Sequence, residues 1–189
     1  MKNNKNIIFE TERLIVRKWQ DSDADDLYEY ASNEDVTKFL TFPTYQSKQE
    51  AYERIAFVKQ QYSENSILGD YCIEHRATNK VIGAITLVHY TPKNQGEVEI
   101  GYVLNPKFQG QGFMTECLLG MFQHVKQRQI AKRIILECDV ENIKSSNVMK
   151  RAGMTFEGVL RKAGANNYHT RHDLALYSIL DEEIKGVSL

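Results

Sequence analysis

A glycine-rich turn between a strand-like and a helix-like segment is the feature that most constrains the fold of this chain. The turn is residues 109–112, Gln-Gly-Gln-Gly. Residues 97–104 before it alternate with the period of a β-strand, and residues 113–128 after it repeat apolar side chains at helical spacing. Because glycines permit unusual backbone angles and the first amides of a helix lack intrahelical acceptors, this order predicts a main-chain cradle for an anion such as a phosphate.

Two well-known phosphate-binding motifs fit this turn poorly. A P-loop ends in Gly-Lys-Ser/Thr, whereas Gly112 is followed by Phe113 and Met114. A dinucleotide-binding fingerprint needs a third glycine or an alanine where this chain has Thr115. ATP, GTP and NAD are therefore disfavoured as ligands, and the alternative that the glycines only turn the chain into a helix stays open.

The rest of the chain is typical of one α+β domain. No repeat or linker divides the 189 residues, a length that suits a single domain. Two helices are expected in the first third, at about 21–32 and from Ser47 onward, where Glu50 completes a capping-box pattern. Seven segments have the pattern of strands: about 14–18, 69–76, 81–88, 97–104, 133–138, 154–160 and 173–180.

Charge and cysteine content exclude several classes of protein. With 24 basic and 25 acidic residues, the chain carries no basic surface of the kind that binds nucleic acid. No long apolar stretch or secretory signal is present, so we expect a cytoplasmic protein with no membrane partner. Cys72, Cys117 and Cys138 form no CxxC pair and are expected to be buried, and His169 with His172 lack a third ligand, so no metal site is predicted.

Residues 109–114, Gln-Gly-Gln-Gly-Phe-Met, resemble the acyl-CoA signature Gln/Arg-x-x-Gly-x-Gly/Ala of the GNAT superfamily of N-acetyltransferases. Residues 98–104 and 141–154 extend the match in register. The segments 11–14 (Thr-Glu-Arg-Leu) and 156–161 resemble the RimJ/RimL branch, the ribosomal-protein N-terminal acetyltransferases. The similarity covers about residues 8–182, which we take as one GNAT domain.

The resemblance implies a fold and a reaction. The fold is a twisted, mostly antiparallel seven-stranded sheet with one splayed parallel strand pair and helices on both faces. The reaction is transfer of an acetyl group from acetyl-CoA to a primary amine by direct attack in a ternary complex. A homodimer is compatible with the family, although the sequence shows no dedicated interface motif.

The resemblance also implies which residues bind acetyl-CoA. The turn and the first helical turn would hold the pyrophosphate through their backbone amides, and the end of the preceding strand together with Asn142 would contact the pantetheine arm. Met114 departs from the family pattern, which has a small residue there. The implied cofactor-binding residues are Val103, Leu104, Gln109, Gly110, Gln111, Gly112, Phe113, Met114, Thr115, Asn142 and Ser145.

Acetyl transfer from a thioester to an amine needs a base for the amine and a proton donor for the leaving thiolate. Many family members carry a carboxylate at the position of Glu99, which we predict to be the base, with Glu97 and Glu157 as alternatives. Many family members have a tyrosine as the proton donor at the position that Met149 occupies in this chain, so the resemblance implies Ser145 as the proton donor instead. Ser145 has an alternative role as a plain helix cap.

The acceptor amine is left open by the sequence. The acceptor is either a peptide N-terminus, as in the RimJ/RimL branch, or a small amine such as a polyamine, amino sugar or antibiotic. Trp19, Phe39, Phe42 and Tyr45 either shape its pocket or belong to the core. A different class of function, a CoA-binding sensor without turnover, is supported only by Met114 and the missing tyrosine.

Overall fold

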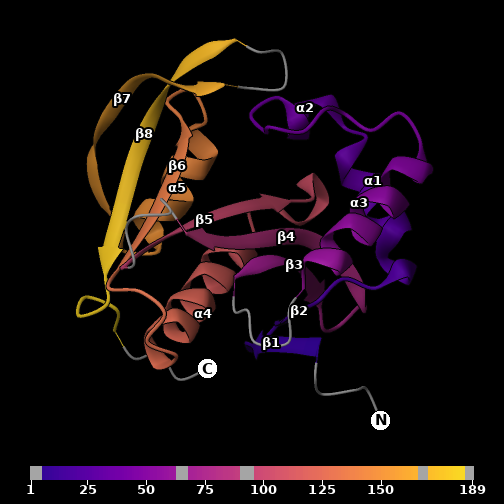
Figure 1. The fold of residues 1–189 in the computed structure, drawn as a ribbon, viewed down its shortest axis with the longest axis horizontal. Coiled ribbons are helices and arrows are strands. Elements are labelled where there is room, and N and C mark those ends of the chain that lie inside the picture. Colours follow the sequence, from indigo (N-terminus) through magenta and orange to yellow (C-terminus); the bar gives the residue numbers. More distant parts are fainter. Residues whose placement is uncertain (1–5, 63–67, 90–95, 166–169, 186–189) are drawn as a thin grey trace.

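A computed structural model describes residues 6–62, 68–89, 96–165 and 170–185. Its strands form one sheet in the order β1-β2-β3-β4-β5-β6-β8-β7 (Figure 1). Neighbouring strands are antiparallel except β5 and β6, which are parallel. The strands are β1 (Ile7–Glu10), β2 (Leu14–Arg17), β3 (Gly69–His75), β4 (Lys80–His89), β5 (Glu97–Leu104), β6 (Arg133–Asp139), β7 (Thr155–Ala165) and β8 (Arg171–Leu180).

The expected count of seven strands is wrong, because the residues that the structure describes already form a sheet of eight. The additional strand is β1, a four-residue edge strand that pairs with β2. Its place depends on a distant helix: a Cβ built on Gly120 would lie 2.5 Å from the Phe9 ring, so only glycine lets α4 approach β1 this closely. A strand of four residues is too short to show a recognisable hydrophobic periodicity, and its pairing is set by tertiary packing.

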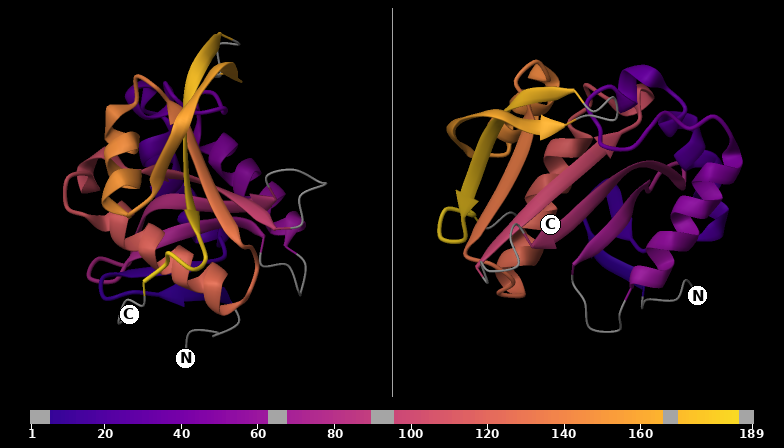
Figure 2. Two further views of the ribbon diagram at one scale, coloured as in Figure 1. Left: turned by 90° about the vertical axis from the view of Figure 1, so that its left-hand side faces the viewer. Right: turned by 45° about the horizontal axis from the view of Figure 1, so that its top comes forward.

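Helices cover both faces of the sheet, as the family resemblance implies (Figures 1 and 2). One core cluster joins the sheet to α4, and the other joins the opposite face to α1 and α3. The capping box predicted for Ser47 and Glu50 is confirmed at the start of α3. The helices are α1 (Ala24–Ala31), α2 (Glu34–Thr37), α3 (Lys48–Gln61), α4 (Phe113–Gln127) and α5 (Ile143–Arg151), and the 3₁₀ turns are η2 (Asp21–Asp23) and η3 (Pro106–Phe108).

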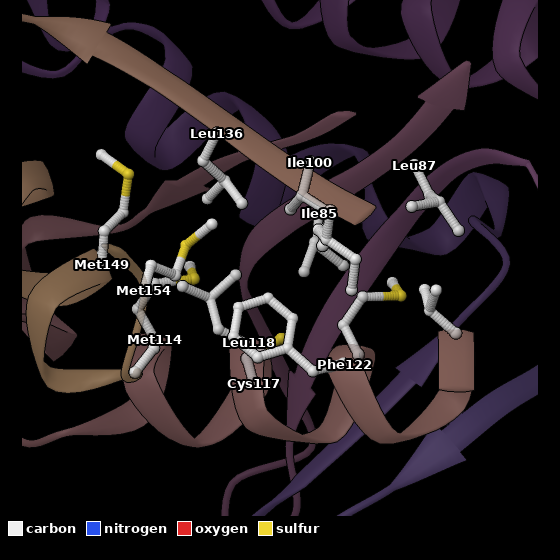
Figure 3. Packing of buried hydrophobic residues seen from close by; sticks show 14 of the residues in the cluster. Ile85, Leu87, Ile100, Met114, Cys117, Leu118, Phe122, Leu136, Met149 and Met154 are labelled. Atoms are coloured by element: carbon white, nitrogen blue, oxygen red, sulfur yellow. The ribbon is translucent and has the colours of Figure 1, made fainter. Parts of the chain in front are cut away.

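The core beneath α4 is apolar and tightly enclosed (Figure 3). Leu118 and Phe122 from α4 lie with Ile85, Ile100 and Leu136 of the central strands, and all are at most 2% exposed. Each such side chain contributes about 1.5–3 kcal/mol by leaving water. This packing makes the sheet a firm base for the amino-terminal end of α4.

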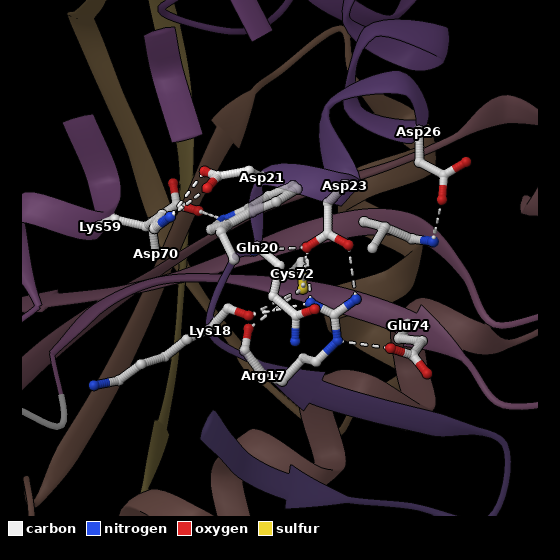
Figure 4. A network of polar contacts seen from close by, with 12 residues as sticks. Arg17, Lys18, Gln20, Asp21, Asp23, Asp26, Lys59, Asp70, Cys72 and Glu74 are labelled. Carbon is white, nitrogen blue, oxygen red and sulfur yellow. Dashed lines mark hydrogen bonds and ion pairs between the residues drawn. The ribbon is translucent and has the colours of Figure 1, made fainter. Parts of the chain in front are cut away.

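A buried ionic cluster anchors the opposite face (Figure 4). Arg17 on β2 donates to Asp23 at 2.7 Å and to Glu74 at 2.6 Å, and all three side chains are under 10% exposed. Removing one partner of such a pair leaves a buried charge unpaired, at a cost of about 3–5 kcal/mol. Because Asp23 directly precedes α1, the cluster fixes that helix against the sheet.

The sheet opens between its two parallel strands. β5 and β6 pair only over Glu97–Glu99 and Arg133–Ile135. Beyond that point β5 stays with β4 as far as Leu104, while β6 stays with β8 as far as Asp139, so the two halves of the sheet diverge (Figure 1). The splayed parallel pair is therefore confirmed. Among the described residues, no helix is both long and apolar enough to cross a bilayer.

Candidate active site

The amino-terminal end of α4 has the geometry of an anion cradle. Gly110 and Gly112 take φ angles of 77° and 81°, in the left-handed region that favours glycine, and Gly112 is the N-cap of the helix. The glycines turn the chain so that the first amides of α4 point out of the helix, where the helix dipole adds positive potential.

This cradle suits a diphosphate. Within the described part of the chain, no hydrogen-bond acceptor is found for the amides of residues 111–115, and the buried Thr115 hydroxyl has no partner. A Cβ built on Gly110 would meet nothing within 4 Å, so there is open space beside the turn. Unpartnered donors at a helix start are the groups that bind phosphate oxygens.

Arg13, which directly precedes β2, supports the cradle from the side of the sheet. Its Nη1 donates to the Gln111 carbonyl at 3.0 Å, and its Nε donates to Glu116 at 2.6 Å. The guanidinium also lies over the Phe113 ring, 4.4 Å from the centroid. The pKa of Glu116 is lowered, because hydrogen bonds from Thr11 and Arg13 outweigh the effect of burial. The sequence marked Arg13 only as part of a family-like segment and gave no sign of this contact.

Gln109 links the end of β5 to α5. Its Nε2 donates to the Leu104 carbonyl at 3.2 Å, and its Oε1 accepts from Lys144 at 3.3 Å. The predicted pantetheine contacts of Val103 and Leu104 thus lie at the opening between β5 and β6, but the Leu104 carbonyl is already engaged. Val103 packs on the opposite face, toward α1 and α3.

Glu99 ends the paired part of β5. Val98 and Ile100 are buried on the α4 face of the strand, so Glu99 lies on the other face, which α1 and α3 cover. Burial, and to a lesser degree the charge of Glu137, raises the pKa of Glu99. No hydrogen bond or ion pair engages its carboxylate among the residues that the structure describes. A half-buried carboxylate with a raised pKa is suited to take up a proton.

The two alternative glutamates are held by one arginine. Arg133 donates to Glu97 at 2.7 Å and to Glu157 at 3.1 Å. Hydrogen bonds from Ser178 and Arg133 lower the pKa of Glu157. Glu157 is therefore a weak base, and Glu97 is occupied by its ion pair with Arg133, so this geometry favours Glu99 over both alternatives.

Ser145 lies on the far side of the opening and contacts β5. Its hydroxyl is 2.8 Å from the hydroxyl of Tyr102, which also lies 3.2 Å from the Ser145 carbonyl. The residue that caps α5 is Asn142, whose side chain accepts from the Ser145 amide at 3.1 Å. The alternative that Ser145 merely caps the helix is therefore wrong, and its hydroxyl contacts Tyr102 of β5 instead.

The two methionines that depart from the family pattern are core residues. Met114 is 3% exposed and Met149 is fully buried, and both side chains pack in the cluster under α4 (Figure 3). Met114 therefore fills the core and leaves its amide in the cradle. Met149 is apolar and cannot give a proton to a thiolate.

A cavity of about 200 Å³ adjoins the opening on the α1 and α3 side. Aromatic residues supply much of its wall, including Trp19, Phe42 and Tyr45 but not Phe39. Asp70 in the wall accepts from the Trp19 indole and from Arg54, each at 2.7 Å. The cavity reaches residues 101–103 of β5, which begin two residues beyond Glu99 on the same strand.

Of the two histidines considered as metal ligands from the sequence, the structure describes only His172. His172 lies 3.8 Å from Asp139, and His169 falls outside the described residues. No group of three or more possible metal ligands occurs in the described ranges. Cys72, Cys117 and Cys138 are buried, as predicted.

The family model described as the acetyltransferase (GNAT) domain matches residues 13–155. The uncharacterized N-acetyltransferase YnaD of Bacillus subtilis (strain 168) is 30% identical over 173 residues, which cover 92% of this chain and 96% of YnaD. The ribosomal-protein-serine acetyltransferase of Escherichia coli (strain K12) is 33% identical over 106 residues, which cover 56% of this chain and 58% of that enzyme.

Solved structures agree with this match. A GNAT-family acetyltransferase from Bacillus anthracis superposes with a TM-score of 0.80 at 26% identity, covering 94% of this chain and 99% of that chain. The ribosomal-protein acetyltransferase RimL, solved in complex with coenzyme A, gives a TM-score of 0.78 at 26% identity and covers 93% and 98% of the two chains. With the family model spanning most of the chain, the splayed parallel strands and the cradle at α4, this chain belongs to the GNAT family and is an acetyl-CoA-dependent N-acetyltransferase.

Proposed function

We propose that this enzyme acetylates a primary amine at the opening between β5 and β6, with Glu99 as general base and Ser145 as proton donor to the leaving sulfur. The amides of residues 109–115 would hold the pyrophosphate of acetyl-CoA, whose thioester supplies the acetyl group. The observation that carries the proposal is the position of Glu99, which ends the paired part of β5 and has a raised pKa.

The chemistry needs both groups. The amine nitrogen attacks the carbonyl carbon only when it is neutral, and Glu99 takes up the proton that the nitrogen loses, directly or through a water. As the C–S bond breaks, its electron pair moves to sulfur, and the Ser145 hydroxyl donates a proton there. Exchange with solvent returns both side chains to their starting states.

The acceptor side is the cavity against α1 and α3. A Cβ built on Gly101 meets nothing within 4 Å, so there is open space over β5 two residues beyond Glu99. The cavity of about 200 Å³ suits a compact group next to the amine, such as the first residue of a peptide. The RimL likeness supports a peptide N-terminus. Asp70 is already paired with Arg54, which makes the wall a poor site for a polycation.

A CoA-binding sensor without turnover is not favoured. Its support was Met114 and the missing tyrosine at Met149. Met114 packs in the core without disturbing the cradle, and Ser145 offers a hydroxyl at the opening where Met149 offers none.

The test measures thiol release from acetyl-CoA with a panel of amines: a peptide with a small N-terminal residue, the same peptide with its N-terminus blocked, spermidine and an amino sugar. Glu99→Gln is expected to lower kcat about a hundredfold and to leave the Kd for acetyl-CoA unchanged. Glu97→Gln and Glu157→Gln are matched controls and should keep kcat within about threefold.

Each result separates one assignment from another. If Glu99→Gln kept the wild-type kcat and Glu157→Gln lost activity, the general base would be Glu157 and not Glu99. A better rate with spermidine or the amino sugar than with the free peptide would replace the peptide acceptor by a small amine. Calorimetry showing no binding of acetyl-CoA at millimolar concentration would remove the cradle assignment.

A further inference from the structure

Tyr102 has a position that neither the family signature nor the proposed mechanism uses. It lies on β5, three residues after the last residue that pairs with β6. Its side chain reaches α5, where its hydroxyl is 2.8 Å from the Ser145 hydroxyl. A phenol that is largely removed from water usually has a hydrogen-bond partner, and for the half-buried Tyr102 the partner is the residue proposed to serve the leaving sulfur.

From this contact we infer that Tyr102 is a positioning residue, which holds the Ser145 hydroxyl so that its proton is directed at the leaving sulfur. The inference rests on the proposed role of Ser145. A serine hydroxyl rotates freely about its C–O bond, and only one orientation points the proton at a given acceptor. The single phenol proton of Tyr102 has two acceptors on Ser145, the carbonyl at 3.2 Å and the hydroxyl oxygen at 2.8 Å. When Tyr102 donates to the closer hydroxyl oxygen, it occupies a lone pair there, and the Ser145 proton is left to point away from Tyr102.

The surroundings keep Tyr102 in the required form. Burial raises the pKa of the Tyr102 phenol, so it stays protonated and remains a donor at physiological pH. The Cys138 thiol of β6 is also influenced by Ser145, which lowers the pKa of the thiol against the larger effect of burial. Ser145 thus acts on one group from β5 and one from β6, on the two sides of the opening.

The next serine of the same helix provides a matched comparison. Ser146 is hydrogen-bonded to the Tyr177 hydroxyl of β8 at 2.6 Å, and both residues are buried. The two tyrosine–serine pairs both tie α5 to the sheet, but only the Tyr102 pair faces the opening. If anchoring of α5 were the sole role of such a pair, both tyrosines would matter alike for catalysis.

The experiment compares steady-state kinetics of Tyr102→Phe, Ser145→Ala, the double variant and Tyr177→Phe, with thermal unfolding as the check on folding. We expect Ser145→Ala to lower kcat about a hundredfold and Tyr102→Phe to lower it about tenfold, with the KM for acetyl-CoA changed by less than about twofold. The double variant should be no slower than Ser145→Ala, because a residue that acts through Ser145 has nothing left to position. Tyr177→Phe should keep kcat within about twofold.

The outcomes distinguish this inference from the proposed function. Wild-type kcat in Ser145→Ala would overturn both. A slow Ser145→Ala with a wild-type rate in Tyr102→Phe would overturn the positioning role alone. The positioning role would also be overturned if the reductions in kcat of the two single variants multiplied in the double variant. It would be overturned as well if Tyr177→Phe were as slow as Tyr102→Phe. A Tyr102→Phe defect confined to the KM for acetyl-CoA would make Tyr102 a binding residue and also overturn the inference.

Discussion

Arg13 and Glu116, 103 residues apart in the chain, join the start of β2 to the first turn of α4 through a hydrogen bond of 2.6 Å. The Arg13 amide donates to the same carboxylate at 2.9 Å, and Thr11 donates at 2.6 Å. Through these bonds the sheet holds the helix end whose amides form the cradle. The contact on the Gln111 carbonyl fixes the turn as well.

Arg13→Lys is expected to weaken acetyl-CoA binding about five- to twentyfold, with a smaller effect on kcat. Lysine cannot reproduce the planar contacts that the guanidinium makes with Glu116, Gln111 and the Phe113 ring, so the turn loses its brace. Titration calorimetry measures the change. Arg128→Lys, which follows the other end of α4, is the matched control and should bind normally; equal weakening in both would show that the brace has no specific role.

Gly112→Ala is expected to destabilise the fold by about 1–2 kcal/mol and to weaken acetyl-CoA binding more than tenfold, because an L-residue at φ 81° is strained and a relaxed turn moves the amides. Gly153→Ala provides the control, since Gly153 has φ 86° with open space around it and lies after α5. It should lose similar stability in denaturant unfolding and bind acetyl-CoA normally. Normal binding by Gly112→Ala would contradict the cradle.

The pH dependence of turnover should report Glu99. Its pKa is raised from an ordinary 4.5 by burial and by Glu137, and the base works only when deprotonated. Activity should therefore fall as the pH is lowered through a midpoint above 4.5. Glu137→Gln removes the smaller of the two causes, the neighbouring negative charge, so the midpoint of the activity profile should move to lower pH. The comparison is made by measuring kcat against pH for the wild type and for Glu137→Gln, with one acceptor at a saturating concentration. A midpoint that moves to higher pH in the variant would contradict the assignment of Glu99 as the base.

Stability should decline in mild acid because of His124 on α4. Burial, and to a lesser degree Arg128, lowers the pKa of His124 from 6.5 to about 4, and its Nε2 has no hydrogen-bond partner among the described residues. Between these values the unfolded chain binds a proton that the folded chain does not, so stability is full above pH 6.5 and falls as the pH drops toward 4. Allowing for partial exposure, the loss is about 1–2 kcal/mol.

His124→Gln should remove this part of the pH dependence. Urea unfolding of both proteins at several pH values between 7 and 4 gives the slope of stability against pH. The absolute stability of the variant is not the criterion, since the substitution also changes packing against Phe9. An unchanged slope in the variant would assign the acid sensitivity to other groups.

The sequence alone determined the features that arise from neighbouring residues. The capping box of Ser47 and Glu50, the turn made by Gly110 and Gly112, and the helical and strand periods are encoded over a few residues, so they could be predicted. The GNAT fold was implied by the resemblance of residues 109–114 and their flanks to the family signature. Strand β1 escaped prediction because four residues carry no period and its place depends on Gly120.

Only the tertiary structure decided which groups are chemically available. Glu97, Glu99 and Glu157 look alike as sequence, yet Arg133 holds two of them and burial leaves Glu99 with a raised pKa. The contact of Tyr102 with Ser145 spans 43 residues of chain, and that of Arg13 with Glu116 spans 103. Side-chain partners this far apart are set by how the strands and helices pack, and no local pattern of residues encodes that packing.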